Sequence, residues 1–380
     1  MQQFKFLESL VEFEPTGSSV LSIYLNTEPN ETGKKDFDVF LRKQFSEHGA
    51  VLEPDTAEKE SFDADEKRTN EFLNSLDPSI RGVAIFASSD SNGLFKQFTF
   101  QVPFEENAFF REDRPFVSPL LKLFSKNPPF VVVAADTNHA DIYLFRRGKT
   151  IDVDQVQNIK TNRSEVGGWS QMRYQRHIDN FHQQHAKEVV QELSKLVRDE
   201  NIDHIVLCGD ETVIIPMLKA ELPKELEDKL VATLSLNVET PEHEIHEQAK
   251  KALDEFEANA DKERIELVLD QNYDEGRGVV GLEKTLEALM NGQVQELYVL
   301  SDFDQINYDR GTVRTILHAY EPGEDTELPD AAERELLIDE VLKKGAQTAD
   351  HIRFIDNADL LQTHGGIAAL LRYQVKGANQ

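Results

Sequence analysis

The stretch PFVVVAADTNHADIYLFRRGK, residues 129–149, predicts two β-strands joined by a polar turn, an antiparallel hairpin. A helix is expected over residues 171–199, because apolar residues recur there at helical spacing. The following segments predict a strand at HIVLCG (204–209), a helix near 211–220, a strand at VATLSLNV (231–238) and a further helix beginning at Thr240-Pro241. We interpret residues 128–261 as one α/β unit.

The segments on either side of this unit also alternate strands with helices. On the N-terminal side, VLSIYLNT (20–27) and GVAIFAS (82–88) predict buried strands, and a charged helical region (35–76) separates them. On the C-terminal side we expect strands at IELVLD (265–270), ELYVLSD (296–302) and HIRFID (351–356), with helices at 281–292 and 331–345. Such alternation predicts βαβ units and a mainly parallel sheet. The predicted fold class is therefore α/β, in three domains over residues 1–127, 128–261 and 262–380.

Composition and charge exclude several classes of protein. The 380 residues are 39% hydrophobic and 29% charged, with a formal net charge of −29 that argues against indiscriminate nucleic-acid binding. No apolar run approaches the ~18 residues of a membrane span, and the N-terminus lacks the plan of a signal peptide. The single cysteine excludes an intramolecular disulfide and a multi-cysteine zinc site. We expect a cytoplasmic protein with no cofactor and no metal ion.

One basic island stands against this acidic background. Residues 146–176 carry seven basic and three acidic side chains, a local net charge of +4. A protein with this distribution can present one tip to RNA while the rest of its surface repels phosphate. The candidate RNA-binding residues are Arg146, Arg147, Lys149, Arg163, Ser170, Arg173 and Arg176.

Within the island, Gly167 and Gly168 stand directly before the long helix in the stretch RSEVGGWSQMRYQR, residues 163–176. Two consecutive glycines allow φ values closed to other residues and let the backbone approach a ligand closely. The form GG-x-S-x-x-R-(Tyr/Phe)-x-R resembles the loop that archaeal and eukaryotic class I release factors insert into the ribosomal peptidyl-transferase centre. Ser170, Arg173 and Arg176 fill matching positions.

The resemblance extends beyond this loop. VLSIYLNTEP, RGVAIF and DRPFVSPLL are similar to segments of bacterial relatives of the archaeo-eukaryotic release factors. GVVGLEKTLEALMNGQVQELYVL and HGGIAALLRY resemble the third domain of release factors and of Pelota-type rescue factors. The resemblance implies a middle domain of ribonuclease-H-like topology and a C-terminal domain similar to kink-turn-binding ribosomal proteins.

The resemblance also implies partners: the ribosomal A site with its rRNA, peptidyl-tRNA and a translational GTPase, but neither DNA nor a membrane. The catalytic candidates are Gly167, Gly168, Trp169 and Gln171. The family has glutamine where this chain has Trp169, and an indole, with one donor and no useful acceptor, cannot position water as an amide does. It can stack on a base. Gln171 is the nearest amide that could act instead.

Three functions stay open at this stage. The first is a codon-independent release or rescue factor that hydrolyses peptidyl-tRNA, since no stop-codon-reading motif is present. The second is a non-catalytic occupant of idle or hibernating ribosomes, with Trp169 as a stacking wedge. The third is a nuclease acting on tRNA ends, for which only Glu165 lies next to the loop. Whether the protein is an enzyme is therefore not decided by the residues.

Four further patterns have ordinary structural interpretations. Gly276-Arg-Gly-Val-Val-Gly281, with Asp302 downstream, matches a dinucleotide fingerprint, but five residues separate it from the strand expected at IELVLD. His177, His182 and His185 are interpreted as part of a polar helix face. His243-Glu-Ile-His246 has one residue too few for a metalloprotease motif. Cys208 is expected to be a buried small hydrophobe.

Overall fold

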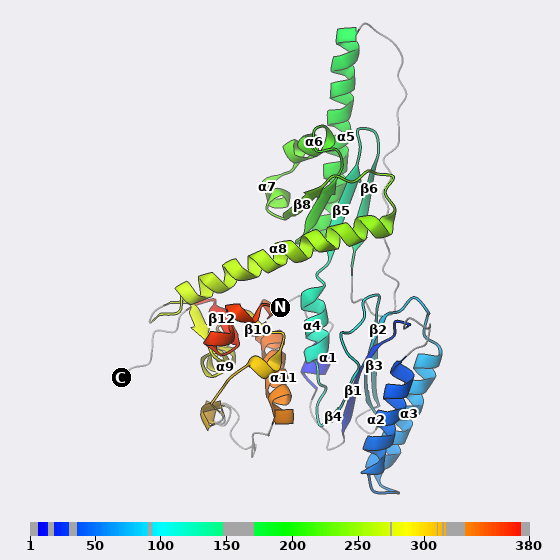
Figure 1. The fold of residues 1–380 in the computed structure, drawn as a ribbon, viewed down its shortest axis with the longest axis vertical. Coiled ribbons are helices and arrows are strands. Elements are labelled where there is room, and N and C mark those ends of the chain that lie inside the picture. Colours follow the sequence, from blue (N-terminus) through cyan, green and yellow to red (C-terminus); the bar gives the residue numbers. More distant parts are fainter. Residues whose placement is uncertain are drawn as a thin grey trace. The chain divides into compact units, whose positions relative to one another are not determined.

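The computed structural model describes residues 7–13, 19–29, 36–89, 93–146, 171–273, 276–309, 311–313, 315–316 and 331–373. These residues form a mixed α/β protein with three four-stranded sheets, which confirms the predicted class (Figure 1). Each sheet falls within one of the three predicted domain segments. The chain divides into two compact units: the described parts of 1–127 and 261–380 form the first, and those of 128–147 and 153–260 form the second. Three separate domains stay a prediction.

The N-terminal part of the first unit is an antiparallel sheet with helices. Its elements are α1 (Glu8–Val11), β1 (Val20–Asn26), α2 (Phe37–Ala50), α3 (Ala57–Asn74), β2 (Gly82–Ser88), β3 (Leu94–Phe100), β4 (Ala108–Glu112) and α4 (Ser118–Lys126). The strand order is β3-β2-β1-β4. Because side chains alternate along β1, Leu21 and Ile23 pack beneath α2 and α3, whereas Tyr24 joins the core shared with α4.

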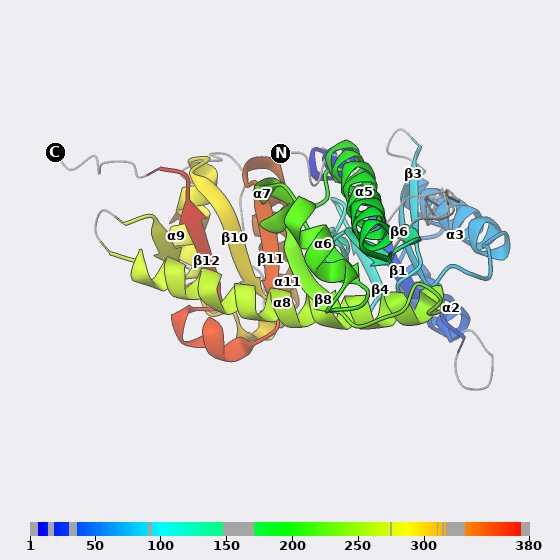
Figure 2. The ribbon, with the colours of Figure 1, turned by 90° about the horizontal axis from the view of Figure 1, so that it is seen from above.

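The second unit is built around the sheet β6-β5-β7-β8. Its elements are β5 (Phe130–Ala135), β6 (Ala140–Phe145), α5 (Gln171–Asp199), β7 (Ile205–Cys208), α6 (Ile214–Glu221), α7 (Lys224–Glu227), β8 (Leu230–Leu234) and the first part of α8 (Glu242–Asp270). Helices α5 and α6 cover one face of the sheet, and α8 covers the other (Figure 2). The predicted hairpin is confirmed: β5 and β6 pair in antiparallel register from Phe130↔Phe145 to Ala135↔Ala140.

The C-terminal part of the first unit has the strand order β11-β10-β12-β9. After the last turns of α8 it consists of β9 (Gly278–Val280), α9 (Leu282–Met290), β10 (Val294–Leu300), η2 (Phe303–Gln305), α11 (Ala331–Thr348), β11 (His351–Ile355), η3 (Ala358–Leu360), η4 (Gln362–His364) and β12 (Ile367–Leu371). Its core is continuous with that of the N-terminal part: Leu120 and Phe116 belong to the same buried cluster as Leu297 and Ile338. This shared core explains why the two segments form one unit.

Two sequence-based expectations are wrong. The sheets are not mainly parallel: the pairs β10–β11, β5–β7 and β7–β8 are parallel, and the other six described pairs are antiparallel. IELVLD is not a strand but the last six residues of helix α8. Ile265 and Val268 are buried while Leu267 is 48% exposed, a helical pattern of burial. A short apolar run is ambiguous between the two structures. Among the described residues, no helix is both long and apolar enough to span a bilayer.

Candidate functional site

The Gly-Gly segment connects strand β6 to helix α5. Most of the residues proposed from the sequence lie outside the described residues, namely Arg147, Lys149, Arg163, Gly167, Gly168, Trp169 and Ser170. For Gln171, Arg173 and Arg176 the structure describes the backbone, which forms the first two turns of α5. The roles of these residues therefore stay predictions, and the structure informs on the scaffold that carries them.

Arg146 anchors the start of this connection. Its guanidinium forms an ion pair with the carboxylate of Glu200 and lies 3.4 Å from the Glu200 carbonyl oxygen, just after the C-terminal end of α5. Helix α5 has 29 residues and is therefore ~43 Å long at 1.5 Å per residue. The described ends of the connection, Arg146 and Gln171, thus lie near opposite ends of this helix. Arg146 has a structural partner, and its predicted contact with RNA is untested.

The C-terminal half of α5 holds the helix to the sheet. From Ala186 onward its buried face contacts the sheet and α6 through Val189, Leu193 and Val197, and Gln183 donates a hydrogen bond of 3.1 Å to Glu221 on α6. Figure 1 shows the N-terminal turns of α5 extending beyond α6. Backbone N–H groups at a helix N-terminus favour anions such as phosphate. The first turns of α5, beginning at Gln171, thus project away from the sheet.

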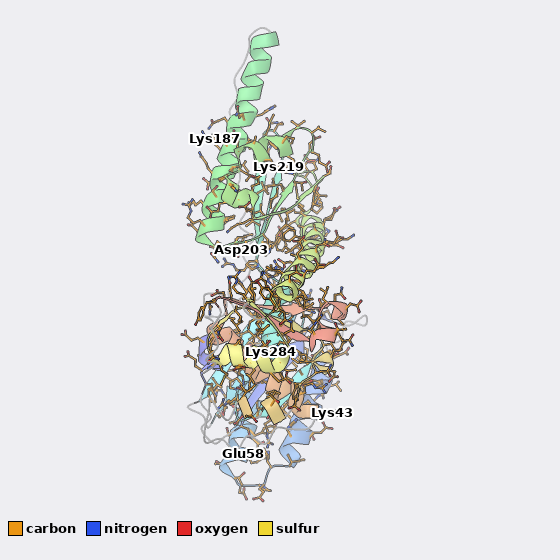
Figure 3. All side chains as sticks on the ribbon, turned by 90° about the vertical axis from the view of Figure 1, so that its left-hand side faces the viewer. Lys43, Glu58, Lys187, Asp203, Lys219 and Lys284 are labelled. Carbon is orange, nitrogen blue, oxygen red and sulfur yellow. The ribbon has the colours of Figure 1, made fainter. Side chains whose placement is uncertain are left out.

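The described part of α5 carries no excess of positive charge. Between residues 182 and 199, Lys187, Lys195 and Arg198 are balanced by Glu188, Glu192 and Asp199. Lys187 and Lys219, on α5 and α6, are exposed (Figure 3). The excess of basic residues in the 146–176 island therefore does not continue into the C-terminal part of α5.

The histidines of α5 do not form the uniformly polar face that the spacing predicted. His185 is only 6% exposed, and its Nε2 has no hydrogen-bond partner among the described residues. The prediction is wrong for His185, because the helix turns this position toward the buried side next to Ala186. The side chain of His177 lies outside the described residues, and His182 is half-buried.

The Gly276–Gly281 motif is structural in the described geometry. The N–H groups of Gly276, Gly278 and Gly281 donate to the carbonyl oxygens of Tyr273 (2.8 Å), Gln271 (3.0 Å) and Ile367 (2.9 Å). A Cβ on Gly276 or Gly278 would lie 1.8 Å or 2.0 Å from a backbone oxygen at the end of α8. The glycines permit this close approach, and the three N–H groups are not available to hold a phosphate.

Other candidate centres also have local explanations. Asp302 accepts hydrogen bonds from the N–H of Asp304 (3.1 Å) and from the side chain of Gln305 (2.8 Å), as the cap of η2. The ring of His246 packs against that of Phe145, with the two ring centroids 4.6 Å apart. Cys208 is fully buried, as predicted, and burial raises the pKa of its thiol to about 12. Within the described ranges, no group of three or more His, Cys, Asp or Glu side chains could hold a metal ion.

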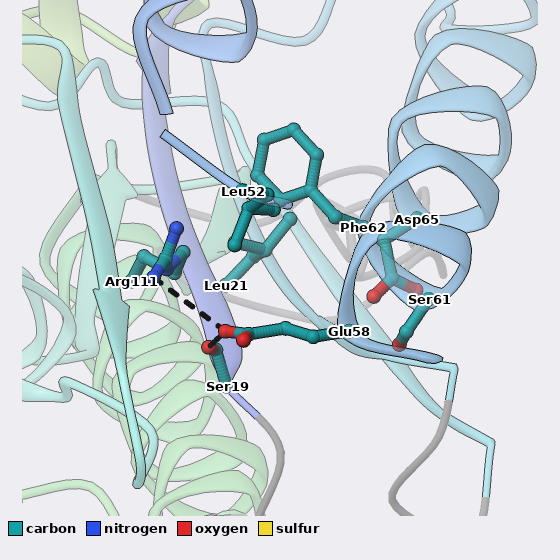
Figure 4. A pocket seen from close by; sticks show the side chains of 8 residues that line it. All are labelled: Ser19, Leu21, Leu52, Glu58, Ser61, Phe62, Asp65 and Arg111. Atoms are coloured by element: carbon teal, nitrogen blue, oxygen red, sulfur yellow. Dashed lines mark hydrogen bonds and ion pairs between the residues drawn. The ribbon is translucent and has the colours of Figure 1, made fainter. Parts of the chain in front are cut away.

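A small cavity lies between helix α3 and the N-terminal sheet, and both polar and apolar side chains line it (Figure 4). Glu58 accepts a hydrogen bond of 2.7 Å from Ser19 and lies 3.5 Å from Arg111, and Ser61 and Asp65 line the cavity from the same helix as Glu58. The cavity measures about 10 Å³, room for about one water molecule. It is too small for a substrate.

Comparison with known proteins identifies the relatives of this scaffold. Residues 115–254, which include the hairpin, the Gly-Gly segment and α5, match bacterial archaeo-eukaryotic release factor family 10. Peptide chain release factor subunit 1 of Methanobrevibacter smithii is 19% identical over 413 residues, covering 98% of this chain and 97% of that protein. The chain is a distant relative of the archaeo-eukaryotic release factors. The chain is also 23% identical to peptide chain release factor subunit 1 of Aeropyrum pernix, and the match covers 98% of this chain and 94% of that protein.

Solved structures of similar proteins come from the same group. The crystal structure of the archaeal translation termination factor aRF1 matches with a TM-score of 0.25 at 18% identity. The match covers 98% of the present chain and 97% of the aRF1 chain. A model of ribosome-bound archaeal Pelota and ABCE1 matches with a TM-score of 0.41 at 15% identity. The match covers 98% of the present chain and 95% of the matched chain.

Proposed function

We propose that this release-factor relative is a ribosome-associated translation factor that enters the A site and directs Gly167, Gly168 and Trp169 towards the peptidyl-transferase centre. The observation that carries the proposal is the match over 98% of the chain to two proteins named peptide chain release factor subunit 1. A match over almost the whole chain favours the action of a release or rescue factor over reuse of one domain for another purpose.

The scaffold around helix α5 supports this proposal. A helix that is packed from Ala186 onward and extends beyond α6 can hold its first residues at a distance from the acidic body. The basic residues nearest the start of α5, Arg163, Arg173 and Arg176, then meet rRNA or tRNA phosphates, while the rest of the chain, which is strongly acidic, stays away from them. Such a division of charge suits a protein that inserts one tip into an RNA cavity.

Two modes of action fit the residues after the glycines. In the first, the side-chain amide of Gln171 orients the water that attacks the peptidyl-tRNA ester, and the factor releases stalled chains without reading a codon. In the second, Trp169 stacks on a base and the factor occupies idle ribosomes without chemistry. The second mode is favoured by the replacement of the family's glutamine with Trp169, since an indole has no useful acceptor for water.

The test combines co-sedimentation with a release assay. Ribosomes carrying labelled P-site peptidyl-tRNA and an empty A site are mixed with the full-length protein, and both binding and released peptide are measured. Hydrolysis that is lost in Gly168→Ala and Gln171→Ala, with binding retained, supports the first mode. Binding without release, weakened by Trp169→Ala, supports the second. Absence of binding by the wild-type protein overturns the proposed function.

A translational GTPase is the further partner that the resemblance implies. The solved structure of yeast Dom34 is described as that of a translation termination-like factor interacting with Hbs1. We propose that a translational GTPase delivers this protein to the A site, and the co-sedimentation assay tests it. Stronger ribosome binding with a GTPase and a non-hydrolysable GTP analogue supports delivery, whereas identical binding with and without the GTPase contradicts it.

A further inference from the structure

A groove of about 710 Å³ lies within the first unit and belongs to none of the sites described above. Its lining includes residues of helix α4, of the β3–β4 connection and of β4. Helix α4 packs against β11, so that the groove ends at the C-terminal sheet. We call this feature the α4 groove, and we define it by Phe104, Glu106, Phe110, Lys122, Phe303 and Glu335.

The topology of the C-terminal sheet places the carboxyl ends of two strands at this groove. Strands β10 and β11 are parallel, with register from Glu296↔His351 to Leu300↔Ile355, so that their carboxyl ends meet at one edge. Ser301–Asp304 follow β10, Asp356 follows β11, and all of these residues line the groove. The carboxyl ends of parallel strands are the usual place for ligands in α/β sheets, because loops and helix ends converge there.

The charge of the α4 groove is strongly uneven. Six carboxylates line it, together with two lysines: Glu105, Glu106, Asp302, Asp304, Glu335, Asp356, Lys122 and Lys126. Both lysines are paired: Lys122 lies 2.7 Å from Glu105, and Lys126 lies 2.7 Å from Asp356. Neither lysine forms a described ion pair with Glu106 or Glu335.

The carboxylates around Glu335 repel one another. Partial burial, followed by the charges of Asp304 and Glu106, raises the pKa of the Glu335 carboxyl above its ordinary value. Arg334 compensates Asp304 only in part, at 3.4 Å from a carboxylate oxygen that is largely exposed to solvent. Among the described residues, Glu106 and Glu335 form no ion pair. A cation bound here would relieve this repulsion.

Aromatic rings supply apolar surface in the same groove. Phe104 and Phe116 are almost fully buried, whereas Phe110 and Phe303 are half-buried. Phe110 and Phe116 stack with ring centroids 3.8 Å apart, which fixes the β4 wall. A groove lined by aromatic rings and carboxylates offers two kinds of complementarity at once, to apolar side chains and to ammonium or guanidinium groups.

We propose that the α4 groove binds a segment of a partner protein that carries lysine or arginine side chains beside a bulky apolar residue. The apolar residue contacts the ring of Phe303, and the cations lie against Glu106 and Glu335. Nucleic acid is excluded as the occupant, because the six carboxylates repel phosphate. The proposal does not depend on ribosome binding through the Gly-Gly segment.

The experiment measures binding of a short fluorescent peptide of alternating lysine and phenylalanine to the full-length protein by anisotropy. The test variant is the double change Glu106→Gln with Glu335→Gln, and a second variant is Phe303→Ala. The matched control, Glu192→Gln with Glu247→Gln, removes two exposed carboxylates from α5 and α8, so that the net charge becomes less negative by the same amount as in the double test variant. We expect each test variant to weaken binding by about tenfold and the control to leave it unchanged.

Three results would overturn the proposal. Equal weakening by the control means that the peptide senses only the overall charge of −29. Unchanged affinity in both test variants places the peptide elsewhere. Displacement of the peptide by micromolar spermidine, with spermidine binding lost in the double variant, assigns the groove to small polyamine cations instead of a protein segment. Circular dichroism of each variant verifies that the fold is intact.

Discussion

The carboxylate of Asp339, on helix α11, accepts a hydrogen bond of 2.7 Å from the backbone N–H of Ser118, the first residue of helix α4. The same oxygen accepts from the N–H of Val117 at 2.8 Å and from the Ser118 hydroxyl at 2.5 Å. The second oxygen lies 3.0 Å from Nζ of Lys343, and both charged side chains are buried. A residue 221 positions away in sequence thus caps α4 and joins the N-terminal and C-terminal parts of the first unit.

We predict that Asp339→Ala lowers the free energy of unfolding of the first unit by about 3 kcal/mol. The substitution removes the buried carboxylate that pairs with Lys343, and it also removes the acceptor for the N–H groups at the start of α4. Urea unfolding followed by far-UV circular dichroism measures this change. The control is Glu340→Gln, which removes the more exposed partner of Lys343 and should cost less than about 1 kcal/mol. An equal loss of unfolding free energy in the two variants would show that the hydrogen bonds of Asp339 to α4 do not stabilise the protein.

A second prediction concerns Asp65, which is 1% exposed and accepts hydrogen bonds from the Ser89 hydroxyl (2.6 Å) and N–H (3.1 Å). Burial is the largest cause that raises the pKa of Asp65 above its ordinary value, so that the folded state binds this proton more tightly than the unfolded state. The contribution of Asp65 to stability therefore falls as pH rises from the ordinary carboxyl pKa through the raised one. Asp65→Asn should remove this dependence, so its stability relative to wild type increases across that window.

Asp77 provides a matched control for this experiment. It accepts the same pair of hydrogen bonds from Ser79, at 2.7 Å and 2.8 Å, but it is exposed, and these bonds lower the pKa of its carboxyl. The sign is then reversed: its stabilising contribution is present above the ordinary pKa and is lost as pH falls through the lowered one. Urea unfolding across pH values should show opposite trends for Asp77→Asn and Asp65→Asn. Parallel trends would contradict the assignment to burial.

The third prediction tests Gly278, the first residue of β9. A methyl group at Gly278 would lie 2.0 Å from the carbonyl oxygen of Val268, so that Gly278→Ala must displace the backbone at the end of α8. We expect the free energy of unfolding to fall by about 2 kcal/mol, as in other overpacked sites. Gly311→Ala is the control, since its Cβ would meet nothing closer than 3.5 Å. Thermal unfolding compares the two variants, and an unaffected Gly278→Ala protein would contradict the close approach.

The fourth prediction uses the single cysteine as a probe of the second unit. Because burial raises the pKa of Cys208 to about 12, its thiolate fraction at pH 8 is roughly a thousandfold below that of an ordinary cysteine. Native protein should therefore react with a thiol reagent very slowly, and unfolding in urea should restore the normal rate. Ser235→Cys, at an exposed position after β8 in a Cys208→Ala background, should react quickly without urea. Rapid labelling of native Cys208 would refute its burial.

Local pattern was sufficient for many elements. The apolar runs of β1, β2, β5, β7 and β10 were recognisable because strands buried on both faces have continuous apolar sequences. Strands β3 and β4 were not predicted, because their side chains are largely half-buried and their sequences lack a clear alternation. The strand predicted at IELVLD proved helical, since six residues cannot distinguish the two periods when a preceding helix continues through them.

The candidate site was predictable only as a motif. Gly167, Gly168 and the basic residues around them are recognisable in the sequence, because their residue types and spacing match a family pattern. No local signal pointed to Arg146 as the partner of Glu200, since the two residues are 54 positions apart. The α4 groove was likewise invisible, because its carboxylates come from segments that are separate in the chain and ordinary in composition.

The sequence by itself determined the α/β class, most of the secondary structure and the kinship with release factors, because these depend on the period of apolar residues and on short motifs. Only the tertiary structure decided that the first and third segments share one core, that Asp339 caps α4, and that the glycines of residues 276–281 serve packing. The physical reason is that burial and hydrogen-bond partners depend on contacts between residues far apart in the chain, which no local pattern encodes.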